Sequence, residues 1–268
     1  MPIHNLSVLI HNSTRWIHYF SVLTHNTEKI EGYVFAAKYL LISFHRHYIM
    51  KKLVLIALLA VSTPKGYTQT VEDIFNPNDI KVSWLGIDFS HVKLIGDFSQ
   101  FFGAGLKSTN QIKDEYFVGW NTIIMNEPKK YDIKSMLRKG DIFYDVDMIM
   151  GLNAKTPLET IESYNTPKYT KENIKGFVDA YNLESKEGLG VLFIAECLNK
   201  NAAEGIFHFL IINMKTKEIL VEKRMSSVPS GFGLRNYWAA SIYKIIKDIK
   251  DNQYPTWKKI YKTQSLIF

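Results

Sequence analysis

The chain has 268 residues, of which 46% are hydrophobic and 22% are charged, a composition typical of globular proteins. Its single Cys excludes a disulfide-stabilised scaffold and a cysteine-rich zinc site. The formal net charge is +7, but residues 1–68 hold seven basic and only two acidic side chains, so residues 69–268 are nearly balanced. Because a nucleic-acid-binding domain normally has a marked basic excess, we expect no nucleic-acid partner.

Residues 50–68 have the three parts of a secretory signal peptide. Met50 and two lysines precede nine apolar residues, Leu53–Val61, and small residues and Pro64 follow. As a helix, the apolar run spans only about 14 Å, so we expect no stable transmembrane anchor. The expected cleavage site carries no Cys, which disfavours a lipoprotein. The pattern predicts an exported protein, periplasmic or secreted, with a buried helix as the alternative.

Residues 1–49 differ from the rest of the chain and contain six of its eight His. The first four recur every seven residues, which on a helix separates neighbours by roughly 10 Å, too far to share a metal ion. We therefore expect no metal site, and we interpret residues 1–49 as upstream sequence translated from a misplaced start codon. Metal binding by this His-rich stretch is the alternative.

Residues 69–268 are predicted to form one α/β domain, a single mixed sheet with packed helices in the order β-β-α-α-β-α-β-β-β-α. Two strands, 81–88 and 91–96, are separated near Ser90. Apolar residues every three or four positions predict a helix over 110–126, which Pro128 ends, and a shorter one over 133–137. Strict alternation over 141–150 predicts a strand.

The remaining residues are predicted to form one helix, three strands and a long closing helix. Thr170 is the expected N-cap of the first helix, and Trp238 and Ile242 belong to the buried stripe of the last. The tail 251–268, with Pro255 and Trp257, is expected to pack back over the domain. The predicted ranges are 171–181 for the first helix, 189–198, 205–214 and 218–225 for the strands, and 234–250 for the closing helix.

The order of these last elements resembles the small α/β domain of secreted envelope accessory proteins, typified by curli-secretion and penicillin-binding-protein-activator lipoproteins. The features that carry the resemblance are the strand ending at Leu198, the strand 206–213, the tight turn 215–217 and the closing helix 234–250. The chain as a whole also resembles secreted proteins of Bacteroidota. The resemblance implies an envelope location and an accessory role, but similarity of fold alone does not assign a function.

Two groups of acidic residues are candidates for catalysis. Asp145 and Asp147 share one face of the predicted strand 141–150, roughly 7 Å apart, a spacing that suits a divalent cation or a catalytic carboxylate pair. The alternative is a solvated edge strand. Asp88 and His91 flank the break at Ser90, where His91 is a candidate general base. The alternative there is a polar loop between two strands.

A glycine-containing loop before the closing helix is a candidate anion site. Gly231 and Gly233 precede the helix N-terminus and Arg235 lies in its first turn, so backbone N–H groups and a guanidinium can bind an anion. The alternative is a turn that needs positive φ angles. The loop lacks the third glycine of a dinucleotide-binding fingerprint and the Gly-Lys-Ser/Thr of a P-loop, and we expect no cofactor.

Cys197 and His208 are interpreted as structural. Alternation along the strand places Cys197 on the face of Ala195 and Phe193, as a buried and unreactive thiol. His208 lies in mid-strand between two Phe and is expected to be a hydrogen-bonded core residue.

Two classes of function follow from these observations. The first is an exported, non-enzymatic binding or envelope-accessory protein whose partner is an envelope component or a small anionic ligand. The second is a hydrolase or transferase that uses Asp145 with Asp147, or Asp88 with His91. The enzyme interpretation requires these groups to converge in one concave pocket.

Overall fold

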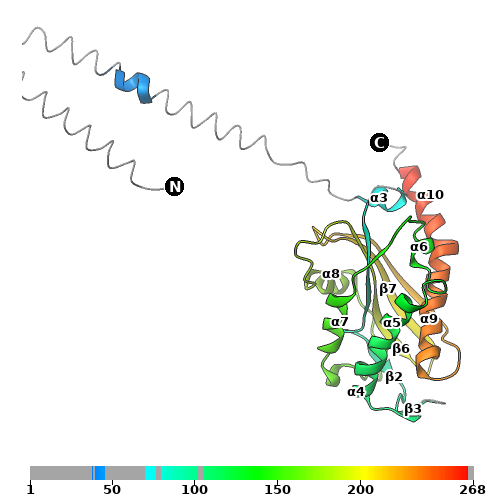
Figure 1. Cartoon of the computed structure of the whole chain (residues 1–268). Coiled ribbons are helices and arrows are strands. Elements are labelled where there is room, and N and C mark those ends of the chain that lie inside the picture. The colour runs from blue at the N-terminus through cyan, green and yellow to red at the C-terminus, as the bar shows by residue number, and fades with distance from the viewer. Residues whose placement is uncertain (1–37, 39, 46–69, 77–79, 102–104, 265–268) are drawn as a thin grey trace, which may run out of the picture. The chain divides into compact units, whose positions relative to one another are not determined.

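A computed structural model of the chain describes residues 38, 40–45, 70–76, 80–101 and 105–264, and it divides into two units, Met1–Tyr67 and Thr68–Phe268 (Figure 1). In the first unit only Lys38 and 40–45 are described, and they are helical and exposed. The predicted upstream extension 1–49 otherwise lies outside the described residues, as does the predicted signal peptide 50–68. Of the helices that the structure describes, none is long and apolar enough to cross a membrane.

The second unit is built on a mixed six-stranded sheet, which confirms the predicted α/β class. The strands are ordered β5-β1-β6-β7-β8, and β2 also pairs with β6. The pairs β1–β5, β1–β6 and β2–β6 are parallel, whereas β6–β7 and β7–β8 are antiparallel. The bounds are β1 Val82–Asp88, β2 Lys93–Ile95, β5 Phe143–Tyr144, β6 Leu189–Asn199, β7 Glu204–Asn213 and β8 Ile219–Ser227. A separate two-stranded antiparallel sheet pairs β3 Gln100–Phe101 with β4 Gly105–Leu106.

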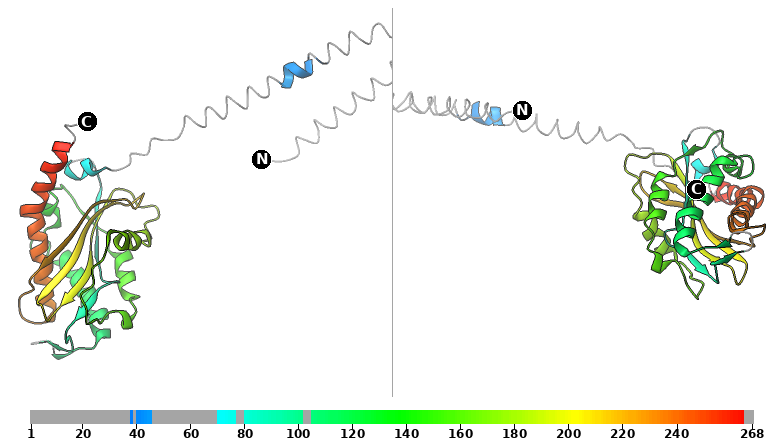
Figure 2. Two further views of the ribbon diagram at one scale, coloured as in Figure 1. Left: turned by 180° about the vertical axis from the view of Figure 1, so that it is seen from behind. Right: turned by 60° about the horizontal axis from the view of Figure 1, so that its bottom comes forward.

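Helices cover both faces of this sheet (Figures 1 and 2). α5, α9 and α10 lie on one face, and α7 and α8 lie on the other. Two separate apolar clusters therefore form, one on each side of the strands. The helices are α3 Val71–Phe75, α4 Thr109–Gln111, the π-helical η1 Ile112–Phe117, α5 Val118–Asn126, α6 Ile133–Met136, α7 Asp147–Ala154, the 3₁₀ turn η2 Leu158–Thr160, α8 Lys171–Asp179, α9 Leu234–Asp248, the π-helical η3 Ile249–Gln253 and α10 Tyr254–Gln264.

The closing helix extends beyond its predicted end. α9 continues through η3 into α10, and Pro255 near the start of α10 explains the π-helical segment. Proline lacks the N–H that would bond the carbonyl of Asp251, and its ring would clash with that carbonyl in a regular α-helix. The wider turn avoids this clash. The predicted packing of the tail is confirmed for the described residues, because Tyr254 is buried and Trp257 stacks on Phe209 of the sheet with ring centroids 5.7 Å apart.

The predicted strand over 141–150 is wrong. Only Phe143 and Tyr144 pair with β1, and α7 begins at Asp147. Val146, Ile149 and Asn153 are buried at spacings of three and four residues, so the segment fits a helical period as well as an alternating one. Packing of the helical face against β1 selects the helix.

The outer edge of β1 is completed by two buried asparagines rather than by a longer β5. The Asn153 side chain accepts a hydrogen bond from the N–H of Phe89 at 2.7 Å and donates to the carbonyl of Ile87 at 2.9 Å. Asn121 of α5 accepts from the N–H of Ile87 at 2.7 Å and donates to its carbonyl at 3.0 Å. The side chains thus provide the hydrogen bonds that a neighbouring strand would supply.

Replacing Asn153 by alanine is expected to lower the free energy of unfolding by about 1–3 kcal/mol, because the buried N–H of Phe89 loses its acceptor. Urea denaturation measures the loss. The exposed Asn236 is the matched control, and its alanine variant is expected to change stability by less than about 0.5 kcal/mol. Equal effects at the two positions would contradict the role given to Asn153.

Candidate functional site

The carboxylates of Asp145 and Asp147 do not form a pair on one strand face. Both Asp145 oxygens bind Lys186 Nζ, at 2.7 and 2.6 Å. Asp147 is exposed in the first turn of α7, where its negative charge interacts favourably with the helix dipole. The two residues thus belong to different local structures, a half-exposed ion pair and a helix N-terminus.

Asp88 is the last residue of β1 and His91 lies in the turn that follows, in a partly buried polar cluster. Asp88 is fully buried and accepts hydrogen bonds from the backbone N–H of Ser90 at 2.7 Å and from the Tyr181 hydroxyl at 2.6 Å. The His91 ring stacks on Phe177 at 3.6 Å between centroids. Burial lowers the pKa of His91, and the nearby Asp88 carboxylate partly opposes that shift.

These two acidic groups are separated along the sheet. The N–H of Asp145 bonds the carbonyl of Trp84, four residues before Asp88 on β1. Four residues of strand correspond to roughly 13 Å. Since each group also has its own partners, the contacts among the described residues do not assemble them into one site.

The loop before α9 contains the backbone geometry of a turn. Gly231 has φ +109° and Gly233 has φ +78°, in the region that side-chain-bearing residues rarely adopt. Arg235 lies in the first turn of α9, with its side chain half exposed and 3.7 Å from Glu127. The Arg235 guanidinium, which was predicted to bind an anion at this loop, therefore already faces the carboxylate of Glu127.

A charged network crosses β6, β7 and β8 on the face that α8 covers. The fully buried Glu196 binds His208 Nε2 at 2.7 Å and the Arg224 guanidinium at 2.6 Å. His208 Nδ1 lies 2.7 Å from Glu222. His208 is therefore satisfied by two partners, as the structural interpretation predicted, although the sequence did not identify either glutamate.

The network compensates for the burial of its charges. Burial alone would raise the pKa of Glu196, but hydrogen bonds from His208 and Arg224, together with their positive charge, lower it to about 2. Both ring nitrogens of His208 face carboxylates, and the Arg224 guanidinium binds Glu196, so each of these groups has a partner within the network. The members of the network are thus paired with one another, as expected of a buried cluster that stabilises the fold.

Cys197 is buried, as predicted, but on the opposite face of the sheet. A β-bulge between Ala195 and Cys197 shifts the register with β7, so that Cys197 packs with Ile95 and Ile206. Burial, followed by the negative charge of Glu196, raises the pKa of its thiol to about 12, which fits the predicted unreactive role.

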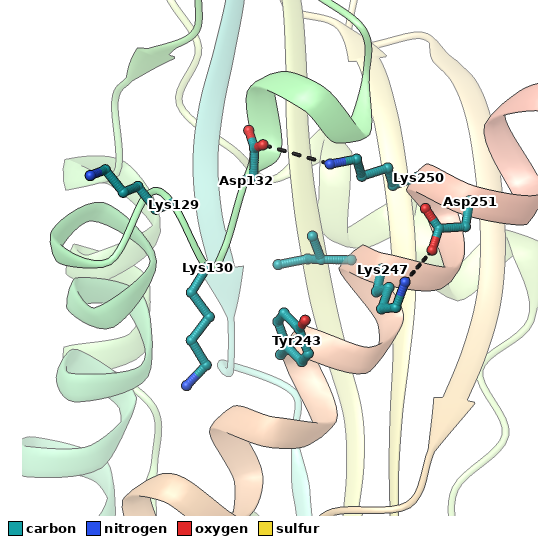
Figure 3. A pocket seen from close by; sticks show the side chains of 8 residues that line it. Lys129, Lys130, Asp132, Tyr243, Lys247, Lys250 and Asp251 are labelled. Carbon is teal, nitrogen blue, oxygen red and sulfur yellow. Dashed lines mark hydrogen bonds and ion pairs between the residues drawn. The ribbon is translucent and has the colours of Figure 1, made fainter.

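A basic cavity lies between the loop that follows α5 and the C-terminal part of α9 (Figure 3). Its volume is about 150 Å³. Lys250 lies 3.7 Å from Asp132, and Lys247 is paired with Asp251, while Lys129 makes no ion pair with any described residue. The lining comprises Lys129, Lys130, Asp132, Tyr243, Ile246, Lys247, Lys250 and Asp251.

A second basic cavity, of about 520 Å³, adjoins the first and shares Lys250 and Asp251 with it. Lys139 is buried there and donates to the carbonyl of Asp73, which ties α3 to the domain. The other lining residues are Lys134, Ser135 and Arg138. We name the two cavities together the basic site.

The basic site concentrates the positive charge of the domain. Its lining has seven basic and two acidic side chains, a net charge of +5. Residues 69–268 as a whole carry a net charge of only +2, so the rest of that region is net negative. The sequence does not reveal this site, because its lysines come from two segments more than a hundred residues apart.

Among the residues that the structure describes, no three His, Cys, Asp or Glu side chains are arranged to hold a metal ion. Comparisons with family models, with curated protein sequences and with solved structures found no match. The structure alone therefore defines the class, an α/β domain with a basic surface site.

Proposed function

We propose that this chain is an exported, non-enzymatic binding protein whose ligand is anionic and binds in the basic site. The observation that carries the proposal is the concentration of seven basic side chains around two adjoining cavities in a region of almost balanced charge. Such a concave basic surface attracts anions and raises their local concentration.

The distribution of the acidic candidates favours binding over catalysis. Asp145 is neutralised by Lys186, and Asp88 is buried against Tyr181. The enzyme alternative needs these carboxylates in one pocket with access to substrate, and no contact among the described residues supports that arrangement.

The export part of the proposal rests on the sequence of residues 50–68. We expect N-terminal sequencing of the protein isolated from its native cells to find a mature N-terminus close to Thr68 or Gln69. Immunodetection of the cell fractions should place the protein in the periplasm or the medium. A mature protein that begins upstream of Met50 would contradict both the misplaced start codon and the cleaved signal peptide.

Phosphate binding by the full chain tests the function itself. We expect saturable binding of inorganic phosphate in isothermal titration calorimetry at about 150 mM salt, where charges further apart than about 8 Å are largely screened. Charge reversal at Lys247 and Lys250, both exposed, should weaken binding by at least about tenfold, because each lost charged hydrogen bond accounts for about 1.5–3 kcal/mol.

Lys223 provides the matched control, because it is also exposed but lies on β8, outside the basic site. Lys223→Glu should leave the affinity within about twofold. Glucuronate, titrated in parallel, distinguishes a general anion site from one that prefers phosphate. If the wild-type chain shows no saturable binding of either anion at millimolar concentration, the proposed function is wrong.

A further inference from the structure

We propose that the ligand of the basic site carries at least two linked phosphate groups, with one group in each cavity and Lys250 between them. This inference rests on the function proposed above and specifies its ligand. The two cavities meet at Lys250 and Asp251, which line both. A chain of phosphates can pass from one cavity to the other beside Lys250, whereas a single phosphate occupies one end.

Basic side chains are present at both ends of the site. Lys129 and Lys130, from the loop after α5, line the first cavity. Lys134 and Arg138, from α6 and the residues that follow it, line the second. The volume of the smaller cavity, about 150 Å³, leaves room for a group of five heavy atoms such as phosphate.

The π-helical turn η3 places the shared residues. Lys250 and Asp251 both belong to η3, the segment that Pro255 forces out of regular α-helical geometry. Single π-helical turns are rare and occur frequently at functional sites. Here two neighbouring residues of the widened turn each line both cavities.

The resident ion pairs are weak enough for a ligand to replace. Lys250 and Asp132 are 3.7 Å apart, with side chains 44% and 32% exposed, and the Lys247–Asp251 pair is exposed to a similar degree. Such surface pairs contribute little to stability. Lys130 lies 3.7 Å from Glu127 and Lys134 lies 3.7 Å from Asp141, again between exposed side chains. Lys129 makes no ion pair within the described part of the chain. An entering phosphate therefore gains contacts with these cations at little cost to the fold.

The test compares orthophosphate, pyrophosphate and tripolyphosphate on the full chain by calorimetry at about 150 mM salt. We expect tripolyphosphate to bind about ten- to hundredfold more tightly than orthophosphate, the gain from one additional charged contact. Lys129→Gln removes a cation from one end, Lys134→Gln removes one from the other, and Lys223→Gln is the control outside the site. All three side chains are exposed, so the variants should fold.

The affinities of the variants for orthophosphate and tripolyphosphate decide whether the inference holds. Both end variants should weaken tripolyphosphate binding by about fivefold or more, whereas only one of them should weaken orthophosphate binding. The inference is overturned if affinity does not rise with chain length, if only one end matters for tripolyphosphate, or if Lys223→Gln has an equal effect. Saturable orthophosphate binding with any of these outcomes leaves the proposed function intact. If no phosphate compound binds to the wild-type chain, the inference is wrong, and the proposed function is wrong with it only if glucuronate does not bind either.

Linked phosphates occur in solution and as lipid headgroups, and a vesicle experiment separates these sources. Phosphatidylcholine vesicles containing a small fraction of a diphosphate-headed lipid are compared with vesicles containing phosphatidic acid. A chain that meets the criteria above and sediments selectively with the diphosphate vesicles uses the lipid-borne form. A chain that meets them and stays in the supernatant uses the soluble form.

Discussion

Replacing Trp238 by alanine is expected to lower the free energy of unfolding by about 3–5 kcal/mol. Trp238 is fully buried on α9, and its ring stacks on Phe98 with centroids 5.8 Å apart and planes 11° from parallel. Truncation leaves a cavity between the closing helix and the sheet. Urea denaturation of the full chain, followed by circular dichroism, measures the loss.

Trp238→Phe serves as the conservative variant. The Trp238 indole N–H is buried with no hydrogen-bond partner among the described residues, so phenylalanine removes ring volume without breaking a hydrogen bond. We therefore expect a clearly smaller loss than for alanine. The fully exposed Tyr164 is the surface control, and its alanine variant should stay within about 0.5 kcal/mol of wild type. A loss below about 1 kcal/mol for Trp238→Ala would show that α9 is not part of the core.

The position of α9 was predictable because its apolar residues follow a single unambiguous period. Trp238, Ile242, Ile245 and Ile249 recur every three or four residues, and all four are buried. The strands β6 and β7 were predictable for a related reason, since a short polar turn separates two long apolar runs. Local pattern and tertiary packing agree at these elements.

The segment around α7 was not predictable from pattern alone. Its residues alternate like a strand, and its buried set of Val146, Ile149 and Asn153 also fits a helix. Short segments of this kind are decided by tertiary contacts, here the hydrogen bonds of Asn153 with β1. The bulge at Cys197 is a similar case, because one extra residue reverses the face of every residue that follows.

The basic site could not be identified from sequence because its residues look like ordinary solvated lysines in each segment. Lys129 and Lys130 follow α5, and Lys247 and Lys250 come near the end of the closing helix. Only the packing of that helix beside α6 brings them together. The loop of Gly231 and Arg235 had a more recognisable local pattern, yet its guanidinium faces Glu127.

The buried network at Glu196 predicts a specific loss of stability in acid. The pKa of Glu196 is lowered from 4.5 to about 2 in the folded state, so its contribution is fully present above about pH 4.5 and is lost as pH falls towards 2. A shift of this size corresponds to about 3 kcal/mol. Urea denaturation at pH 6, 4 and 3 should show the decline.

Replacing Glu196 by glutamine tests whether this carboxylate is the cause. The variant leaves Arg224 without its buried counter-charge and removes the carboxylate partner of His208, and breaking one side of a buried ion pair typically costs about 3–5 kcal/mol. It should also lose the part of the pH dependence that Glu196 contributes, so its stability should fall less steeply than that of wild type below pH 4.5. Glu184→Gln, at an exposed position, should reproduce the wild-type curve. If the Glu196→Gln and wild-type curves are parallel down to pH 3, the acid sensitivity arises elsewhere, and the network stabilises the fold without acting as its titrating group.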